Sequence, residues 1–412
     1  MSELMPAYAI PPHVPPNLVM DFPLAQGNSS YENGFVDIIP KIHAEYPEIF
    51  YARDALAGNT PAWVLRRAED LRRVYLDTEH FSSHGLAPFA LLLQQDWSMV
   101  PLEIDPPLHG HYRAMMNSLF LPKAILRLEE KIRDYARTYI ARFKDKGSCE
   151  FMKEFAFEYP IVVVLELLGL PQSMVTQFLE WEHGLLHEPD IQKIAGATGS
   201  VAGYLRGVIA DRRINPGNDV LSFATTASVD GRAMIDDELL GFAFTLFAGG
   251  LDTVATTLGN MFRCLAENPS LQQRLRDEPG LIPDAIEELL RIHSPSTTNR
   301  TCIKPTTIKG ISILPGDRVL MSTTLGSLDP IEFPQPNEVI IGRERKERHL
   351  GFGYGIHRCI GVHLARTELR IAFEELLDAL PQFHIQPDAK ILSYLANVIQ
   401  IDNLPLAWDA NL

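Results

Sequence analysis

The sequence is poor in cysteine, and its cysteines are not paired. Cys149, Cys264, Cys302 and Cys359 lie far apart, with no C-x-x-C spacing. This distribution argues against zinc ribbons and against a disulfide framework. It suits a protein of the reducing cytoplasm.

Positive charge is also scarce. The chain has 37 Lys and Arg against 52 Asp and Glu, which gives a formal net charge of −15 at pH 7. A general nucleic-acid-binding protein would carry a basic face, so that class is disfavoured. The N-terminal stretch MSELMPAYAIPPHVPP has neither the basic region nor the apolar run of a signal peptide, and no segment approaches ~20 uninterrupted apolar residues. We expect a soluble cytoplasmic protein with no nucleic-acid or membrane partner.

The chain has no obvious linker. Its 412 residues, 46% of them apolar, are enough for a large core and would by default suggest two domains. However, no long Pro/Ser/Gly-rich or single-sign charged run interrupts the sequence after the N-terminus. We therefore expect an extended Pro-rich segment over residues 1–24 and a single domain over residues 25–412.

Hydrophobic periodicity predicts a mainly α-helical protein with a minor β region. The expected helices cover residues 33–42, 68–78, most of 124–215, 236–268 and 283–293. The expected strands cover residues 46–53 and 61–67; residues 294–302 should be extended, and further strands are expected over residues 308–330.

The longest expected helix, residues 236–268, breaks the rules of helix composition in its middle. It is apolar nearly all round, so it should cross the interior. Yet Gly249 and Gly250 cost about 1 kcal/mol each relative to alanine, and a buried Asp252 costs more unless it is paired. Such violations are kept most often at functional sites, where Thr253 could hold a water and Asp252 could pass protons inward. The alternative is a close helix–helix contact with a capping threonine.

Cys359 lies in a glycine-rich loop, HLGFGYGIHRCIGVHLAR, just ahead of a predicted helix. The N–H groups and partial positive charge of an opening helix favour the thiolate over the thiol. From these residues alone, a nucleophile, a redox thiol, a metal ligand and a buried structural cysteine all remain possible.

The pattern Phe352-x-x-Gly355-x-x-x-Cys359-x-Gly361 resembles the haem-binding loop of the cytochrome P450 superfamily. DPPLHGHYR, AGGLDT, ELLR and NRT precede it in the order found in that superfamily. AGGLDT with EELLR and the closing LPLAW is most similar to the camphor-hydroxylase family. The resemblance implies a cytochrome P450 fold over residues 25–412, with haem b (iron protoporphyrin IX) between the long central helix and the cysteine-loop helix.

The resemblance also implies roles for individual residues. Cys359 would be the axial ligand of the haem iron, and Asp252 and Thr253 would deliver protons for O–O cleavage. Other residues beside the haem would be Phe352, Gly249 and Gly250, and its propionates would be held by His109, Arg113, Arg300 and His357. A buried structural network would comprise Glu288, Arg291 and Arg343. The substrate side would be lined by Phe89, Trp97, Leu251, Ser296, Thr297 and Val398.

The implied activity is C–H hydroxylation with O₂ and electrons relayed from NAD(P)H by a reductase and a [2Fe–2S] ferredoxin, in a monomeric enzyme. Trp97 stands where the camphor hydroxylases use a tyrosine hydroxyl to hold the substrate ketone. We therefore expect another small, mostly apolar cyclic terpenoid or an ionone-like norisoprenoid. The alternatives are a haem–thiolate sensor or carrier, a haem-free cysteine hydrolase and a peroxide-driven enzyme.

Two charged regions remain ambiguous in the sequence. Basic residues between Arg343 and Arg358 form either a solvated loop or a docking surface for an acidic electron donor. In the acidic stretch 180–190, His183 and His187 have the i, i+4 spacing of half a zinc site, but their Glu neighbours do not follow the H-E-x-x-H order. This stretch offers no clear basic partner for Asp252.

Overall fold

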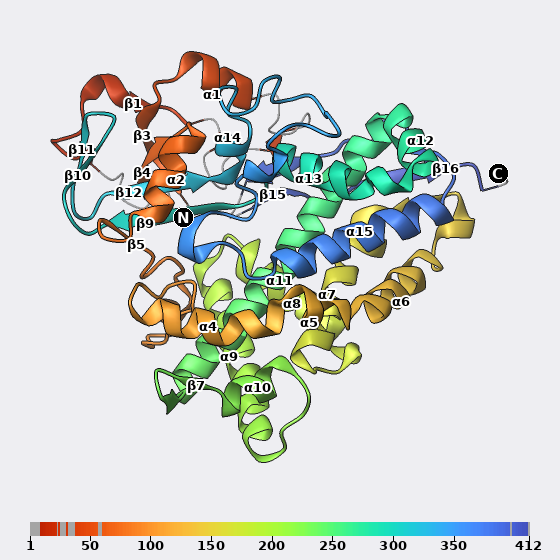
Figure 1. Cartoon of the computed structure of the whole chain (residues 1–412), viewed down its shortest axis with the longest axis horizontal. Helices are drawn as coiled ribbons and strands as arrows, with labels where there is room; N and C mark the ends of the chain where they lie inside the picture. The colour runs from red at the N-terminus through yellow and green to blue at the C-terminus, as the bar shows by residue number, and fades with distance from the viewer. Residues whose placement is uncertain are drawn as a thin grey trace. The chain divides into compact units, whose positions relative to one another are not determined.

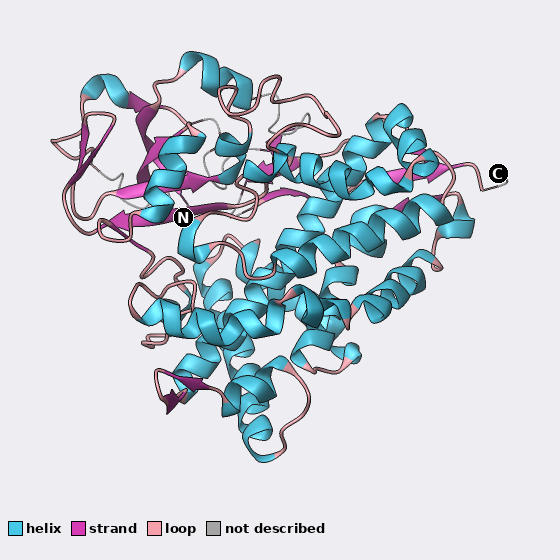
Figure 2. Ribbon diagram, in the orientation of Figure 1, coloured by secondary structure: helices cyan, strands magenta, loops and turns pink. Residues whose placement is uncertain are grey.

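The computed structural model describes residues 9–22, 24, 30–31, 38–56, 60–395 and 398–410. The chain divides into two compact units. Unit 1 comprises Met1–Ser83, Pro283–Cys359 and Asp388–Asp402, and unit 2 comprises His84–Ile282, Ile360–Pro387 and Asn403–Leu412. Unit 1 carries most of the strands, whereas unit 2 is built largely from helices (Figures 1 and 2).

Unit 1 is organised around a mixed six-stranded sheet with the order β1-β3-β4-β12-β9-β5. Its strands are β1 (Val19–Met20), β3 (Ile49–Leu56), β4 (Thr60–Leu65), β5 (Phe81–Ser82), β9 (Thr297–Cys302) and β12 (Arg318–Ser322). The smaller sheets pair β10 (Thr306–Ile308) with β11 (Ile311–Ile313), and β14 (Ser393–Leu395) with β2 (Ser30–Tyr31) and β15 (Ile399–Ile401). The helices are α1 (Ile39–Glu45), α2 (Ala68–Leu76), α14 (Thr323–Ser327) and α13 (Ile282–Ile292), which begins at the unit boundary.

Both faces of the large sheet are covered, and this explains the continuous buried apolar runs at residues 49–52 of β3 and 62–65 of β4. Side chains alternate across a strand, so the neighbours Phe50 and Tyr51 point to opposite faces. Phe50 belongs to a buried cluster with Ile42 of α1, whereas Tyr51 belongs to a second cluster with Leu71 of α2. The sheet therefore forms the middle layer of unit 1.

Unit 2 surrounds the 32-residue helix α11 (Asp236–Glu267). The other helices are α3 (Phe89–Leu92), α4 (Leu108–Phe120), α5 (Pro122–Leu126), α6 (Glu129–Ile140), α7 (Glu158–Leu168), α8 (Val175–Leu186), α9 (Ile191–Ile214), α10 (Val220–Thr226), α12 (Pro269–Asp277) and α15 (Val362–Ala379). The strands are β6 (Ser148–Glu150), β13 (Phe383–Ile385) and β16 (Pro405–Trp408) in one sheet, and β7 (Ser228–Val229) with β8 (Arg232–Ala233) in another.

Helix α11 is the core helix of unit 2. Glu238 accepts a hydrogen bond from the backbone N–H of Ile235 at 3.0 Å, which caps its first turn. The helix is long and apolar enough to cross a membrane, but 72% of its most apolar window is buried inside the protein. Neighbouring helices therefore account for its hydrophobicity.

Most of the predicted elements are confirmed, with shifted ends. The helices expected over 236–268 and 283–293 run from Asp236 to Glu267 and from Ile282 to Ile292. Of the first expected helix, the described residues form α1 from Ile39 to Glu45, and residues 33–37 lie outside the described residues. Within the N-terminal segment expected to be extended, the described part forms a 3₁₀ turn at Pro16–Leu18 and then β1.

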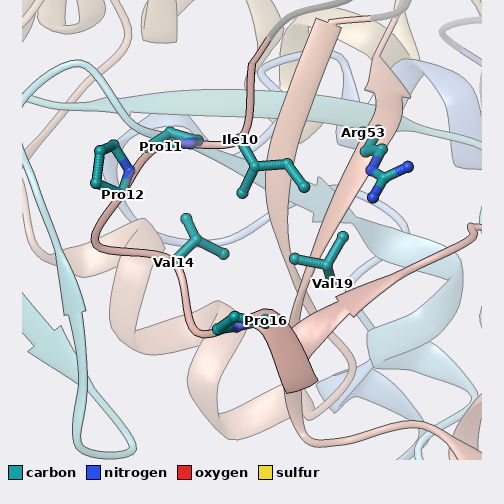
Figure 3. A pocket seen from close by; sticks show the side chains of 7 residues that line it. All are labelled: Ile10, Pro11, Pro12, Val14, Pro16, Val19 and Arg53. Atoms are coloured by element: carbon teal, nitrogen blue, oxygen red, sulfur yellow. The ribbon is translucent and has the colours of Figure 1, made fainter.

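Unit 1 also has a hollow of about 350 Å³ at its N-terminal segment (Figure 3). Its walls are mainly proline and aliphatic side chains, with one guanidinium from β3. The lining residues are Ile10, Pro11, Pro12, Val14, Pro16, Val19 and Arg53. None of the site residues predicted from the sequence lines this hollow.

Candidate active site

The cysteine loop of unit 1 is shaped by glycines at positions where other residues would not fit. The backbone N–H of Cys359 donates to the carbonyl of Phe352 at 2.9 Å and closes the loop. Gly353 and Gly355 have φ values of +67° and +69°, which L-residues rarely adopt. A Cβ at Gly355 would also come within 2.7 Å of the carbonyl oxygen of Tyr75. Two independent constraints therefore require glycine at position 355.

Cys359 differs from the other cysteines in exposure. All four thiols lie among the described residues and none is in a disulfide, but Cys359 is exposed and the others are buried. Burial raises the pKa of Cys149 and Cys302, and it raises that of Cys264 to about 12. Those three groups stay protonated, whereas Cys359 is accessible and lies three residues before the start of α15.

A buried ion-pair network is connected to the cysteine loop through hydrogen bonds. Glu288 and Arg291 are fully buried and form two hydrogen bonds of 2.9 Å, while Arg343 Nε donates to Glu288 at 2.8 Å. Burial alone would raise the pKa of Glu288, but the hydrogen bonds from Arg291 and Arg343 and the positive charge of Arg291 lower it. Arg291 also donates to the carbonyl of Ser327, whose hydroxyl accepts from the backbone N–H of Leu350. The network thus connects α13 to the start of the cysteine loop.

Two more of the predicted haem contacts lie in unit 1. Arg300 of β9 is 5% exposed, donates to the carbonyl of Asn299 at 2.8 Å and lies 5.6 Å from the ring centre of Tyr75. His357 Nε2 is 3.1 Å from the hydroxyl of Ser83. Of these two predicted propionate contacts, Arg300 therefore lies on the sheet and His357 on the cysteine loop.

The structure brings together the substrate-side residues expected in unit 1. Ser296 forms an isolated β-bridge with Val398, and Thr297, which is buried, begins β9 beside it. Ser296 also accepts hydrogen bonds at its carbonyl from the backbone and hydroxyl of Thr323. These contacts of the Ser296 backbone therefore fix its position relative to Val398 and Thr323.

In unit 2, α4 carries the predicted pair His109 and Arg113 one turn apart. Burial lowers the pKa of His109, and the charge of Arg113 lowers it further. Arg113 Nε donates to Asn117 at 3.2 Å. Tyr112 donates to Glu238 at 2.6 Å, which fixes α4 against the start of α11.

The two glycines in the middle of α11 have different surroundings. A Cβ at Gly250 would come within 2.6 Å of Val164 Cγ2, so this glycine allows α7 to pack closely. A Cβ at Gly249 would meet nothing within 4 Å, and Gly249 is exposed. Thr253 Oγ1 donates to the carbonyl of Gly249 at 3.0 Å. Helix packing thus explains Gly250, while Gly249 borders open space.

Asp252 has a basic neighbour that sequence reasoning missed. Its side chain is 4% exposed, and Oδ1 accepts from Thr256 at 3.3 Å. Oδ2 lies 3.6 Å from His187 Nε2, which is 2.7 Å from Glu182 Oε1. In the sequence, i, i+4 spacing pairs His187 with His183. However, His183 is exposed, and the acidic partners of His187 are Glu182 and Asp252. The i, i+5 spacing of Glu182 and His187 across the end of α8 was the available signal.

An aromatic surface adjoins α11. The rings of Phe89 and Trp97 lie 5.1 and 5.0 Å from that of Phe244, and Leu251 is buried on the same helix. The indole N–H of Trp97 donates to Gln95 at 2.9 Å. Trp97 therefore presents ring surface and uses its one donor within the protein.

The family model for cytochrome P450 matches residues 174–400. A probable cytochrome P450 127A1 from Sinorhizobium fredii is 37% identical over 403 residues, with 97% of each chain covered. The chain belongs to the cytochrome P450 family. It is also 32% identical to cytochrome P450-terp of a Pseudomonas species over 308 residues, covering 70% of this chain and 72% of the relative. The crystal structure of CYP101J2 has a TM-score of 0.86 at 28% identity and covers 98% of this chain and 100% of its own.

Family membership confirms the expected fold and identifies the protein as a haem monooxygenase whose cofactor is haem b. The residues present fit that cofactor. Unit 1 offers an accessible thiol on a loop where an added Cβ at Gly355 would strike backbone, together with the buried cation Arg300. Thiolate and guanidinium are the groups that suit an axial iron ligand and a propionate partner.

Proposed function

We propose that this cytochrome P450 hydroxylates a small, mostly apolar cyclic terpenoid or an ionone-like norisoprenoid. Electrons would come from NAD(P)H through a reductase and a [2Fe–2S] ferredoxin, and O₂ would supply the inserted oxygen. The observation that carries the proposal is the buried Asp252 next to Thr253 in the middle of the apolar helix α11, because a buried carboxylate is costly there and such violations are kept most often at functional sites.

The haem would be held by the residues that the family resemblance implies. Cys359 would ligate the iron, with Phe352 beside it, and the propionates would be bound by His109, Arg113, Arg300 and His357. Gly249 would leave room for the macrocycle, whereas Gly250, which was also expected beside the haem, faces Val164 of α7. Once bound, haem with a thiolate ligand supplies the oxidising chemistry, because the thiolate donates electron density that favours O–O cleavage.

The role of Asp252 and Thr253 would be to move protons. Asp252 Oδ1 is held by Thr256, which leaves Oδ2 directed toward His187 and Glu182. Asp252, His187 and Glu182 would form a path for protons. Their side chains are 4–9% exposed, so the path would reach solvent through Glu182 and His187 while Asp252 stays buried. Thr253 Oγ1 would relay the proton from Asp252 toward the reacting oxygen.

The residues proposed for the substrate side in unit 2 are buried and mainly apolar. Phe89, Trp97 and Leu251 offer apolar surface, and the donor of Trp97 is already bonded to Gln95. Ser296, Thr297 and Val398 are the other residues proposed for the substrate side. A ring hydrocarbon with little polarity suits these walls. The name of the Pseudomonas relative, cytochrome P450-terp, agrees with a terpenoid.

The electron donor would be acidic and would dock near the cysteine loop. Lys346 contacts Asp284 and Arg348 contacts Glu332. Arg345 and Arg358 are exposed in the same region and would face the ferredoxin. We further propose a monomeric cytoplasmic enzyme.

Turnover with a ferredoxin and its reductase tests the proposal. Thr253→Ala should lower the product formed per NAD(P)H by about tenfold or more, with the excess electrons released as peroxide or water. The matched control is Thr245→Ala, because Thr245 makes the same kind of bond to the carbonyl of Gly241 two turns earlier. Normal coupling in Thr253→Ala would contradict the assigned role, and absence of any turnover in the wild type would favour a haem–thiolate sensor or carrier.

A further inference from the structure

Glu182, His187 and Asp252 form a compact group of metal-ligating atoms in unit 2. Their three ligand atoms lie within 4.8 Å of one another. Glu182 lies in the last turns of α8, His187 just beyond its end, and Asp252 in the middle of α11. We infer that this triad is a binding site for a divalent transition-metal ion of the Zn²⁺ type.

The distances suit a metal better than a proton shared by all three groups. The Nε2 atom of His187 is 2.7 Å from Glu182 Oε1 but 3.6 Å from Asp252 Oδ2, which is too far for a hydrogen bond. Zn²⁺ lies about 2 Å from nitrogen and oxygen ligands, so its ligand atoms are about 3.3 Å apart in a tetrahedron. Small side-chain rotations would bring all three atoms to that spacing.

Charge also favours a cation here. Two carboxylates converge on one imidazole, and all three side chains are at most 9% exposed. A protonated imidazole balances only one negative charge, whereas a divalent ion balances both. The C-terminal end of α8, at Leu186, adds partial negative charge next to His187. An imidazole in the set favours Zn²⁺ over Mg²⁺ or Ca²⁺, which prefer oxygen ligands.

The surroundings orient the ligands and leave room for a fourth. Thr256 donates to Oδ1 of Asp252, which fixes the carboxylate with Oδ2 toward His187. Hydrogen bonds of this kind orient metal ligands. Three protein ligands leave one tetrahedral position for water. The exposed fraction of the Glu182 and His187 side chains, 9% each, gives the ion a route from solvent.

Occupation of the site would have a functional consequence that rests on the proposed role of Asp252. An ion on Oδ2 would occupy the carboxylate and prevent it from accepting and passing a proton. Micromolar Zn²⁺ would then inhibit product formation and raise the peroxide released per NAD(P)H. Binding itself does not depend on that role.

The test is calorimetric titration of Zn²⁺ into chelator-treated ferric holoenzyme, in which Cys359 is occupied by haem. We expect a saturable site of one equivalent that is lost in His187→Gln and weakened at least about tenfold in Glu182→Gln. His384→Gln is the matched control for surface histidines, because His384 is exposed on β13, and it should bind like the wild type. No binding, or equal affinity in His187→Gln and Glu182→Gln, would overturn the inference.

Turnover separates this inference from the proposed function. Zn²⁺ should uncouple the wild type and the His384→Gln control, and it should leave the residual turnover of Glu182→Gln less affected. One equivalent bound by the triad with no effect on coupling would keep the metal site and remove Asp252 from proton delivery.

Discussion

The cysteine loop of unit 1 and the middle of α11 in unit 2 both contain glycines and a reactive side chain, but they are determined in different ways. In the loop, Gly355 is required by its own φ and by the adjacent backbone of Tyr75. In α11, an added Cβ at Gly250 would meet Val164 on α7, and Asp252 lies 3.6 Å from His187, which is beyond the end of α8. The loop is thus specified partly by its own backbone conformation and partly by α2, whereas Gly250 and Asp252 of the helix are specified by partners from distant segments alone.

The largest effect on stability should come from the network behind the loop. Glu288→Gln leaves the buried guanidinium groups of Arg291 and Arg343 uncompensated, which costs about 3–5 kcal/mol in the free energy of unfolding. Urea titration at pH 7 measures this cost, and exposed Glu79→Gln serves as the control. A change below about 1 kcal/mol would contradict the assigned support role.

The same variant has a defined pH dependence. The pKa of Glu288 in the folded protein is lowered from its ordinary value of 4.5. The stabilisation by its charge is therefore fully present above pH 4.5 and is lost as the pH falls through the lowered pKa. The difference between wild type and Glu288→Gln should be constant from pH 7 to about pH 5 and should shrink only in stronger acid.

A smaller loss is expected when the loop itself is altered. Gly355→Ala combines an unfavourable positive φ with a contact to the carbonyl of Tyr75, so it should cost about 2 kcal/mol or more. Gly310→Ala is the control, because Gly310 has φ +78° with nothing within 4 Å of an added Cβ. It should cost only about 1 kcal/mol. Equal costs in thermal unfolding would show that the contact to Tyr75 does not matter.

In α11, the cost of Gly250→Ala should be reduced by a second substitution at its packing partner Val164. Gly250→Ala places a methyl group against Val164 and should cost about 1–3 kcal/mol. Val164→Ala makes room, so the double variant should be more stable than the sum of the single changes predicts. Strict additivity in a double-mutant cycle would argue against packing as the reason for Gly250. Gly203→Ala, in α9 with free space around its Cβ, should instead stabilise by ~0.5–1 kcal/mol.

The smallest effect on stability is expected at Gly249. Nothing meets its added Cβ, so Gly249→Ala should change the free energy of unfolding by about 1 kcal/mol or less. If the haem occupies that space, the variant should instead lose haem more readily to a haem-binding acceptor protein. Unchanged haem retention with higher stability would show that Gly249 is an ordinary surface position.

The features that could be predicted from the sequence also differ between the cysteine loop and α11. The loop and α11 were predictable, because turn chemistry and apolar periodicity are local properties. The role of Gly250 could not be assigned, since its neighbour Val164 lies on α7. His187 was missed for a similar reason. Its ring turns toward Asp252 only because the chain leaves the helix at Leu186, and helical spacing instead paired it with His183.

The central claim is that Cys359 is the thiolate ligand of a haem monooxygenase. The most direct measurement is the absorption spectrum of the reduced, carbon monoxide-bound holoenzyme, recorded for the wild type and Cys359→His. The wild type should show the strongly red-shifted Soret band of thiolate ligation, and the variant should show the band of a histidine-ligated haem protein. A histidine-type spectrum in the wild type, or a red-shifted band that survives in Cys359→His, would contradict the assignment.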